Sequence, residues 1–192
     1  MTENKLREFL DSSRSQPRPT TGQTPIDRVT IQFGSVIVNT DTLGICDVSQ
    51  VPSGIVIECP SGEYELEAEC YVYGNDARVA RVTAKLTGTQ PAPGALLGTF
   101  GVDMAMAAVF DNDALMAFVE DRPKEYASWI NNDVMMYEWE SAGTLVCEPV
   151  GVEIPYFEVG FGDGRYRAYA LEGDDQIVGI EAVFLDENAP YF

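Results

Sequence analysis

Residues 62–86, GEYELEAECYVYGNDARVARVTAKL, predict the fold most clearly. Charged and apolar side chains alternate in the first half, which is the two-residue period of a β-strand. Every second residue from Glu63 to Glu69 is a carboxylate, so four acids share one face, about 7 Å apart. The intervening residues, from Tyr64 to Cys70, are apolar and face the other way. The stretch therefore begins with a strand that has one buried and one charged face.

A turn in the middle of this stretch is expected to join two strands into a hairpin. The loop over residues 74–76 has a favoured length, and it contains Asn and Asp, which tolerate the left-handed conformation that such loops require. It pairs Tyr73 with Ala77. The apolar faces of the two strands then coincide, and Glu69 faces Arg81.

The same pairing places Glu65 opposite Lys85 and leaves Glu63 and Glu67 without a cross-strand cation. Such pairs contribute about 0.2–1 kcal/mol at an exposed site, and a charged sheet face also opposes unwanted stacking of sheets. Two interpretations stay open. The acids form a solvated face, or Glu63 and Glu67 form part of a docking surface for a basic protein.

The charge of the whole chain narrows the choice of partner. Among 192 residues, 12 are Lys or Arg and 31 are Asp or Glu, for a formal net charge of -19. Nucleic acid and anionic membranes bind proteins mainly through clustered basic side chains, so neither is an expected partner. A cationic protein is the partner that this charge permits.

The residues that the chain lacks exclude several kinds of catalysis. There is no histidine, which rules out Ser-His-Asp and Cys-His nucleophiles and histidine-ligated zinc. The four cysteines form no CxxC motif and are interpreted as small buried hydrophobic residues. We therefore expect no catalytic residue, no metal and no cofactor.

Two regions of different composition are expected along the chain. Residues 1–25, which include SSRSQPRPTTGQTP, are predicted to form a flexible polar segment, and residues 26–192 a single globular domain. The start has no apolar signal region, and no stretch approaches 18 consecutive apolar residues. A cytoplasmic location is the resulting expectation.

Short β segments dominate after Val29, with Gly, Pro and Asn turns every 8 to 12 residues. Only the middle of the chain shows helical spacing. A short helix is predicted over residues 114–121, capped by Asp111, and a longer one from Pro123 to about Tyr137. The expected fold is α+β, mainly antiparallel sheet, with the two helices packed on one face.

A second hairpin is predicted over residues 155–171, PYFEVGFGDGRYRAYAL. Asp163-Gly164 suits the centre of a two-residue type I′ turn. The outward face of this hairpin would combine aromatic rings with charged groups, and Glu158 would lie diagonal to Arg167. It is the candidate surface for a small ligand and consists of Tyr156, Glu158, Arg165, Arg167 and Tyr169.

Other acids also have candidate roles. Asp103 stands alone in an apolar run and is either a buried, hydrogen-bonded group or an acid with a perturbed pKa. Residues 99–163 contain 13 acids and two bases, the most concentrated negative charge in the chain. Within this region, the acids expected to face a partner are Glu125, Asp133, Glu138 and Glu140.

Four segments in order resemble a bacterial family of uncharacterised proteins, domain of unknown function 4241. They are CPSGEYELEAE, NDARVARV, GVDMAMAAVFD and FGDGRYRAYALEGDDQIVGI, and the resemblance covers about residues 43–186. The chain departs from the family pattern at Ala105, where glycine is usual, and at Val159. The resemblance implies a cytoplasmic bacterial domain and no catalytic residue.

The function expected from these observations is that of a non-catalytic acidic binding protein. Its most concrete form is an immunity protein that binds and neutralises a basic bacterial toxin, because opposite charge speeds encounter. The alternative is a small-ligand-binding or enzymatic domain that uses the face with Tyr156, Glu158, Arg167 and Tyr169. A third possibility is a protein that mimics the charge of nucleic acid. Salt would weaken the binding of such a mimic to its basic partner.

Overall fold

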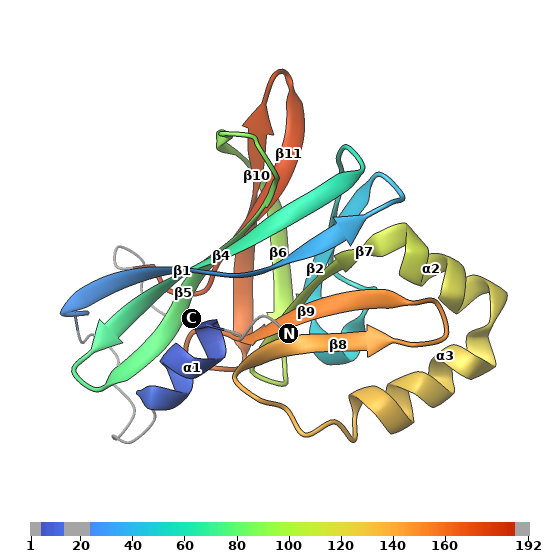
Figure 1. Ribbon diagram of the computed structural model, residues 1–192, viewed down its shortest axis with the longest axis horizontal. Helices are drawn as coiled ribbons and strands as arrows, with labels where there is room; N and C mark the ends of the chain where they lie inside the picture. The colour runs from blue at the N-terminus through green and yellow to red at the C-terminus, as the bar shows by residue number, and fades with distance from the viewer. Residues whose placement is uncertain (1–4, 14–23, 187–192) are drawn as a thin grey trace.

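The structure, a computed structural model, describes residues 5–13 and 24–186. It contains a six-stranded sheet, a five-stranded sheet packed against it, and two helices beyond the second sheet (Figure 1). All paired strands are antiparallel. The predicted α+β class with mainly antiparallel sheet is therefore confirmed.

The six-stranded sheet has the order β1-β4-β5-β11-β10-β6. Its strands are β1 (Asp27–Val38), β4 (Gly62–Tyr73), β5 (Asp76–Leu86), β11 (Gln176–Val183), β10 (Gly164–Gly173) and β6 (Ala92–Val102). The last of the described strands along the sequence, β11, thus lies in the middle of the sheet, between β5 and β10.

The five-stranded sheet has the order β3-β2-β7-β9-β8. Its strands are β3 (Ile55–Glu58), β2 (Thr42–Asp47), β7 (Met106–Asp111), β9 (Val152–Glu158) and β8 (Ala142–Cys147). A short 3-10 turn, η1 (Val48–Gln50), follows β2. The main core lies between the sheets, and it takes alternate residues from both, such as Leu66 from β4 and Val109 from β7.

The helices α2 (Asn112–Asp121) and α3 (Pro123–Trp129) cover the other face of the five-stranded sheet, as predicted. The second predicted helix is shorter than expected, because a π-helical turn, η2 (Ile130–Val134), replaces its end. Asp111 does not cap α2 with its side chain. Its carboxylate instead accepts from the backbone N–H of Asn39, at 2.7 Å, and from the hydroxyl of Thr40.

The predicted flexible segment over residues 1–25 contains a helix, α1 (Lys5–Ser12), so the prediction is wrong for these eight residues. Leu6 and Leu10 are buried in the main core, and their burial holds the helix in place. Residues 14–23 lie outside the described residues. From residue 24, the chain leads into β1.

The first predicted hairpin, β4-β5, is present, with a tighter turn than expected. Tyr73 pairs with Asp76 rather than with Ala77, which leaves a two-residue loop. A β-bulge at Ala80 then shifts the register by one residue, so Glu69 faces Arg81 as predicted. Glu65 likewise faces Lys85.

The second predicted hairpin is wrong. Strand β9 pairs with β7 and β8 in the five-stranded sheet, whereas β10 pairs with β6 and β11 in the six-stranded sheet. The chain crosses between the sheets over residues 159–163, where Gly160 and Gly162 have φ values of 37° and 106°. Glycine tolerates these left-handed values, so the turn signal marks a change of sheet.

A second crossing, from β6 to β7, lies beside the first. Ala105 has a φ of 57°, a left-handed value at which glycine would be less strained. Its N–H donates to the Asp163 carboxylate at 3.0 Å, and its carbonyl accepts from the N–H of Val159 at 2.9 Å. The two crossings therefore support each other.

Candidate functional site

The outer face of the six-stranded sheet carries a ladder of alternating charges. Glu69 on β4 lies 3.7 Å from Arg28 on β1 and 3.5 Å from Arg81 on β5. Arg81 also lies 3.2 Å from Glu181 on β11. The ladder ties four neighbouring strands together. Glu63 and Glu67, on the same face, make no ion pair with any described residue, as the hairpin geometry predicted.

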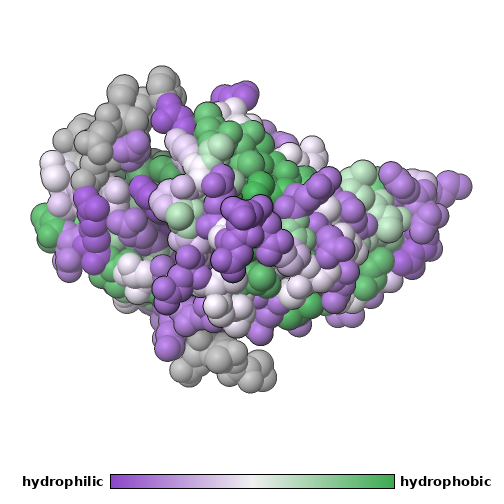
Figure 2. All heavy atoms as spheres, turned by 90° about the horizontal axis from the view of Figure 1, so that it is seen from above, coloured by the Kyte–Doolittle hydropathy of each residue, from purple (hydrophilic) through white to green (hydrophobic). Residues whose placement is uncertain are grey.

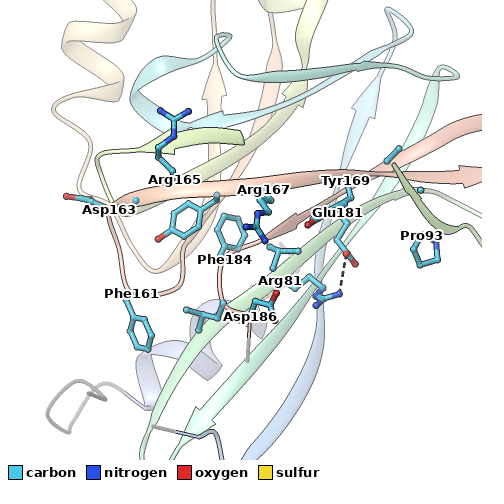
Figure 3. Close-up of a pocket in the computed structure, with 16 residues that line it drawn as sticks. Arg81, Pro93, Phe161, Asp163, Arg165, Arg167, Tyr169, Glu181, Phe184 and Asp186 are labelled. Carbon is cyan, nitrogen blue, oxygen red and sulfur yellow. Dashed lines mark hydrogen bonds and ion pairs between the residues drawn. The ribbon is translucent and has the colours of Figure 1, made fainter. Parts of the chain in front are cut away.

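Beside this ladder, β5, β10 and β11 border a cavity of about 400 Å³ (Figure 3). Three arginines line it, although the whole chain has only 12 basic residues. Three acids also line it, so its formal charge is balanced within a strongly negative protein. The lining residues are Arg81, Pro93, Gly94, Phe161, Asp163, Gly164, Arg165, Tyr166, Arg167, Tyr169, Ala170, Glu181, Val183, Phe184, Leu185 and Asp186.

The three arginines differ in how firmly they are engaged. Arg81 is held by its two carboxylates in the ladder, and Arg165 donates to the Thr99 hydroxyl at 3.1 Å. Arg167 makes no hydrogen bond or ion pair with the described part of the chain. In Figure 3 its side chain extends toward Phe184, whereas that of Arg165 points away.

Tyr166 forms part of the cavity wall. Its hydroxyl donates to the carbonyl of Gly162, and its ring packs edge-on against Phe184 with centroids 5.0 Å apart. Burial, with a smaller contribution from the charge of Asp163, raises the pKa of Tyr166 to about 12. The phenol therefore stays protonated and acts as a hydrogen-bond donor at neutral pH.

The predicted ligand face does not assemble, because its residues belong to different sheets. Arg165, Arg167 and Tyr169 lie on β10 at the cavity. Tyr156, on β9, is fully buried on the helix side of the five-stranded sheet, where its ring lies 4.7 Å from that of Trp139. Sequence reasoning also missed Arg81 and Glu181, since only the fold brings β5 and β11 together.

Glu158 lies 3.6 Å from Arg78, so the predicted surface pairing with Arg167 is wrong. Arg78 is itself held by Asp76 through two contacts, of 2.8 and 3.0 Å. Both partners of this closer pair are largely shielded from solvent. These interactions tie the β4-β5 turn to the end of β9.

The acids predicted to face a partner are divided between the two outer layers. Glu63 and Glu67 lie on the six-stranded sheet, and the other four on the helix side of the molecule. Glu125 is paired with Arg122 at 3.3 Å, and Glu140 with Arg7 of α1. Asp133 and Glu138 are exposed and form no ion pair among the described residues. The six acids therefore cannot form one continuous surface.

Between Asp133 and Glu138, three neighbouring apolar side chains are exposed. Met135 is 49%, Met136 75% and Tyr137 38% accessible. Elsewhere, hydrophilic side chains are spread over the face shown in Figure 2, with hydrophobic patches between them. We call residues 133–138 the methionine patch.

Asp103 is exposed, so the expectation of a buried acid is wrong, and among the described residues its carboxylate accepts only a long 3.3 Å bond from Gln50. The fully buried acid of this region is Asp47. Its carboxylate accepts from the N–H and hydroxyl of Ser49, at 2.7 and 2.5 Å. It also accepts from the N–H groups of Asp103 and Met104, at 2.6 and 2.9 Å.

Within residues 5–13 and 24–186, no group of three Cys, Asp or Glu side chains is placed to hold a metal ion. None of the described helices is long and apolar enough to cross a membrane. Comparison of the chain with models of protein families, with curated proteins and with solved structures found no match. The resemblance to domain of unknown function 4241 stays a prediction.

Proposed function

We propose that the protein is a non-catalytic acidic binding protein whose partner is a cationic protein. Its most concrete form is a cytoplasmic immunity protein that neutralises a basic bacterial toxin. The observation that carries the proposal is the methionine patch, residues 133–138, in which exposed apolar side chains stand between two acids. The net charge of -19 supports a partner of opposite sign.

The composition of the patch suits a protein interface. Methionine and aromatic residues are enriched in the centres of interfaces, and their borders are polar. Tyr137 is also partly anchored before any partner arrives, because its ring contacts those of Trp139 and Tyr156, with centroids 4.8 and 6.0 Å away. A side chain that is already ordered loses less entropy on binding.

The acids beside the patch supply attraction and specificity. Asp133 and Glu138 have no described ion-pair partner, so neither needs to break a pair before it meets a cation. Charges at the border of an interface mainly raise the association rate, and salt screens them over about 8 Å at physiological ionic strength. Binding should therefore weaken as salt rises.

The test is titration of the purified protein with the purified product of the gene adjacent to its own. Met136→Ser should weaken binding about tenfold, because it removes an apolar contact at the centre of the patch. Glu138→Lys should lower the association rate about tenfold at low salt. Glu63→Lys makes the same charge change on the opposite outer layer and should alter the rate less than twofold.

Two results would contradict the proposal. The first is that the neighbouring gene product does not bind and that the cell is unharmed when the gene for this protein is deleted while the toxin gene stays intact. The second is a larger effect from Glu63→Lys than from Glu138→Lys, which would reject the methionine patch and place the contact on the sheet. Each variant is first compared with the wild type by thermal denaturation.

A further inference from the structure

The cavity beside β10 and β11 combines an unengaged positive charge with an apolar wall. We propose that it binds a small organic molecule that carries a carboxylate or phosphate group on an apolar body. This site lies on the outer face of the six-stranded sheet, away from the helix layer. The proposal is therefore independent of any protein partner at the methionine patch.

Arg167 is the anchor for the anionic group. It is exposed and makes no hydrogen bond or ion pair with a described residue, and its side chain extends toward Phe184 in Figure 3. A guanidinium presents several donors in one plane and can hold two oxygens of a carboxylate or phosphate together. Arg81, by contrast, is already committed to Glu181 and to the ladder.

The local charge at the cavity permits an anion despite the acidity of the whole chain. Of the lining acids, Glu181 is bonded to Arg81 at 3.2 Å, and Asp163 accepts from the N–H of Ala105. The negative charges of Glu181, Asp163 and Asp186 equal in number the positive charges of the three lining arginines. Acids more distant than about 8 Å are largely screened at physiological salt. An entering anion therefore meets the guanidinium of Arg167 rather than the net charge of the chain.

The wall of the cavity determines the rest of the ligand. Phe161, Val183, Phe184 and Leu185 line it, and Tyr169 adds a half-buried ring. A volume of about 400 Å³ lies within the range of small-molecule sites, which are mostly apolar with a few polar groups that fix orientation. A molecule with one anionic group and one ring matches this arrangement, whereas inorganic phosphate would leave the apolar wall uncovered.

The probes for the test are phenyl phosphate and benzoate, with inorganic phosphate and benzylamine as controls. Binding to the full chain is measured by calorimetry and by backbone amide NMR shifts. Phenyl phosphate or benzoate should shift the amides of β10 and β11, and inorganic phosphate should bind at least about tenfold more weakly. The tighter of the two aromatic probes identifies the preferred anionic group.

Two variants locate the contact. Arg167→Gln should weaken binding of the tighter aromatic probe at least about tenfold, since it removes the charge and keeps much of the length. Arg28→Gln, the matched control, removes an arginine from the same sheet face outside the cavity and should change affinity less than about twofold. Val183→Phe fills the cavity and should abolish binding of both aromatic probes.

Three outcomes would overturn the proposal. The first is that neither aromatic probe binds at about 5 mM, where even weak sites are occupied. The second is that Arg167→Gln and Arg28→Gln lose affinity for the aromatic probe equally. The third is that benzylamine binds as tightly as the anionic probes. Thermal denaturation of each variant shows whether it is folded, so a loss of binding is not confused with a loss of structure.

Discussion

Replacing Asp47 with alanine should strongly destabilise the fold, because this buried carboxylate serves several donors at once. Three of its four donors are backbone N–H groups, on Ser49, Asp103 and Met104. They link the end of β2 to the loop by which the chain passes from one sheet to the other. A buried donor left without an acceptor costs about 1–3 kcal/mol.

The magnitude follows from these three donors. The combined cost of leaving them without an acceptor is about 3–9 kcal/mol. The lower half of this range applies, because the exposed side chain of Asp103 shows that water lies nearby and can bond to some of the freed N–H groups. We expect Asp47→Ala to lower the free energy of unfolding by about 4 kcal/mol. Asp47→Asn retains one acceptor oxygen and should cost about 2 kcal/mol.

Urea denaturation followed by circular dichroism measures this loss. With a slope of about 2.5 kcal/mol per molar, the midpoint should fall by about 1.6 M for Asp47→Ala and about 0.8 M for Asp47→Asn. Asp103→Ala removes a neighbouring but exposed carboxylate and should change stability by less than about 0.5 kcal/mol. Equal midpoints for Asp47→Ala and Asp103→Ala would refute the assignment of the buried hydrogen bonds to Asp47.

Three further predictions concern stability and reactivity. Arg78→Ala leaves the buried carboxylate of Asp76 without its cation and should lower the free energy of unfolding, measured by urea denaturation, by about 3 kcal/mol. Arg122→Ala removes a cation from an exposed pair and should lower it by less than about 1 kcal/mol. Because the pKa of Tyr166 is raised from 10.0 to about 12, the unfolded chain releases this proton first. Its contribution to stability, complete below pH 10, should decline between pH 10 and 12, as alkaline thermal melts of the wild type and a Phe variant would show. Burial raises the pKa of Cys147 to about 11, so its thiol should react with Ellman's reagent at pH 8 only after unfolding; rapid reaction of the native thiol would contradict its burial.

The elements predictable from the sequence are those with a strong local pattern. The β4-β5 hairpin was predicted because charged and apolar side chains alternate over residues 62–86 and so identify the buried and exposed faces of both strands. The pairings of Glu69 with Arg81 and of Glu65 with Lys85 were correct although the predicted turn was one residue too long. Two compensating features, a tighter loop and a bulge at Ala80, restored the register. Strand β6 carries no such local pattern, because its sequence APGALLGTFGV contains glycine and proline and does not alternate.

The remaining errors arose where distant segments decide the structure. Gly162, Asp163 and Gly164 form a local turn signal, but β9 finds its partners in the other sheet, so the signal could not reveal a change of sheet. Only some of the residues that line the cavity were among those of the predicted ligand face. Arg165, Arg167 and Tyr169 belong to one strand, whereas Arg81 and Glu181, 100 residues apart, meet only after the sheet forms.

The central position of β11 has a consequence for biosynthesis. Strands β1, β4 and β5 can pair soon after a ribosome makes them, but one edge of β5 stays open until residues 176–183 emerge. An open edge invites pairing with other chains, and contacts between distant segments slow folding. Until those residues emerge, β5 lacks the neighbour that it has in the folded sheet, and the six-stranded sheet cannot be closed at its centre.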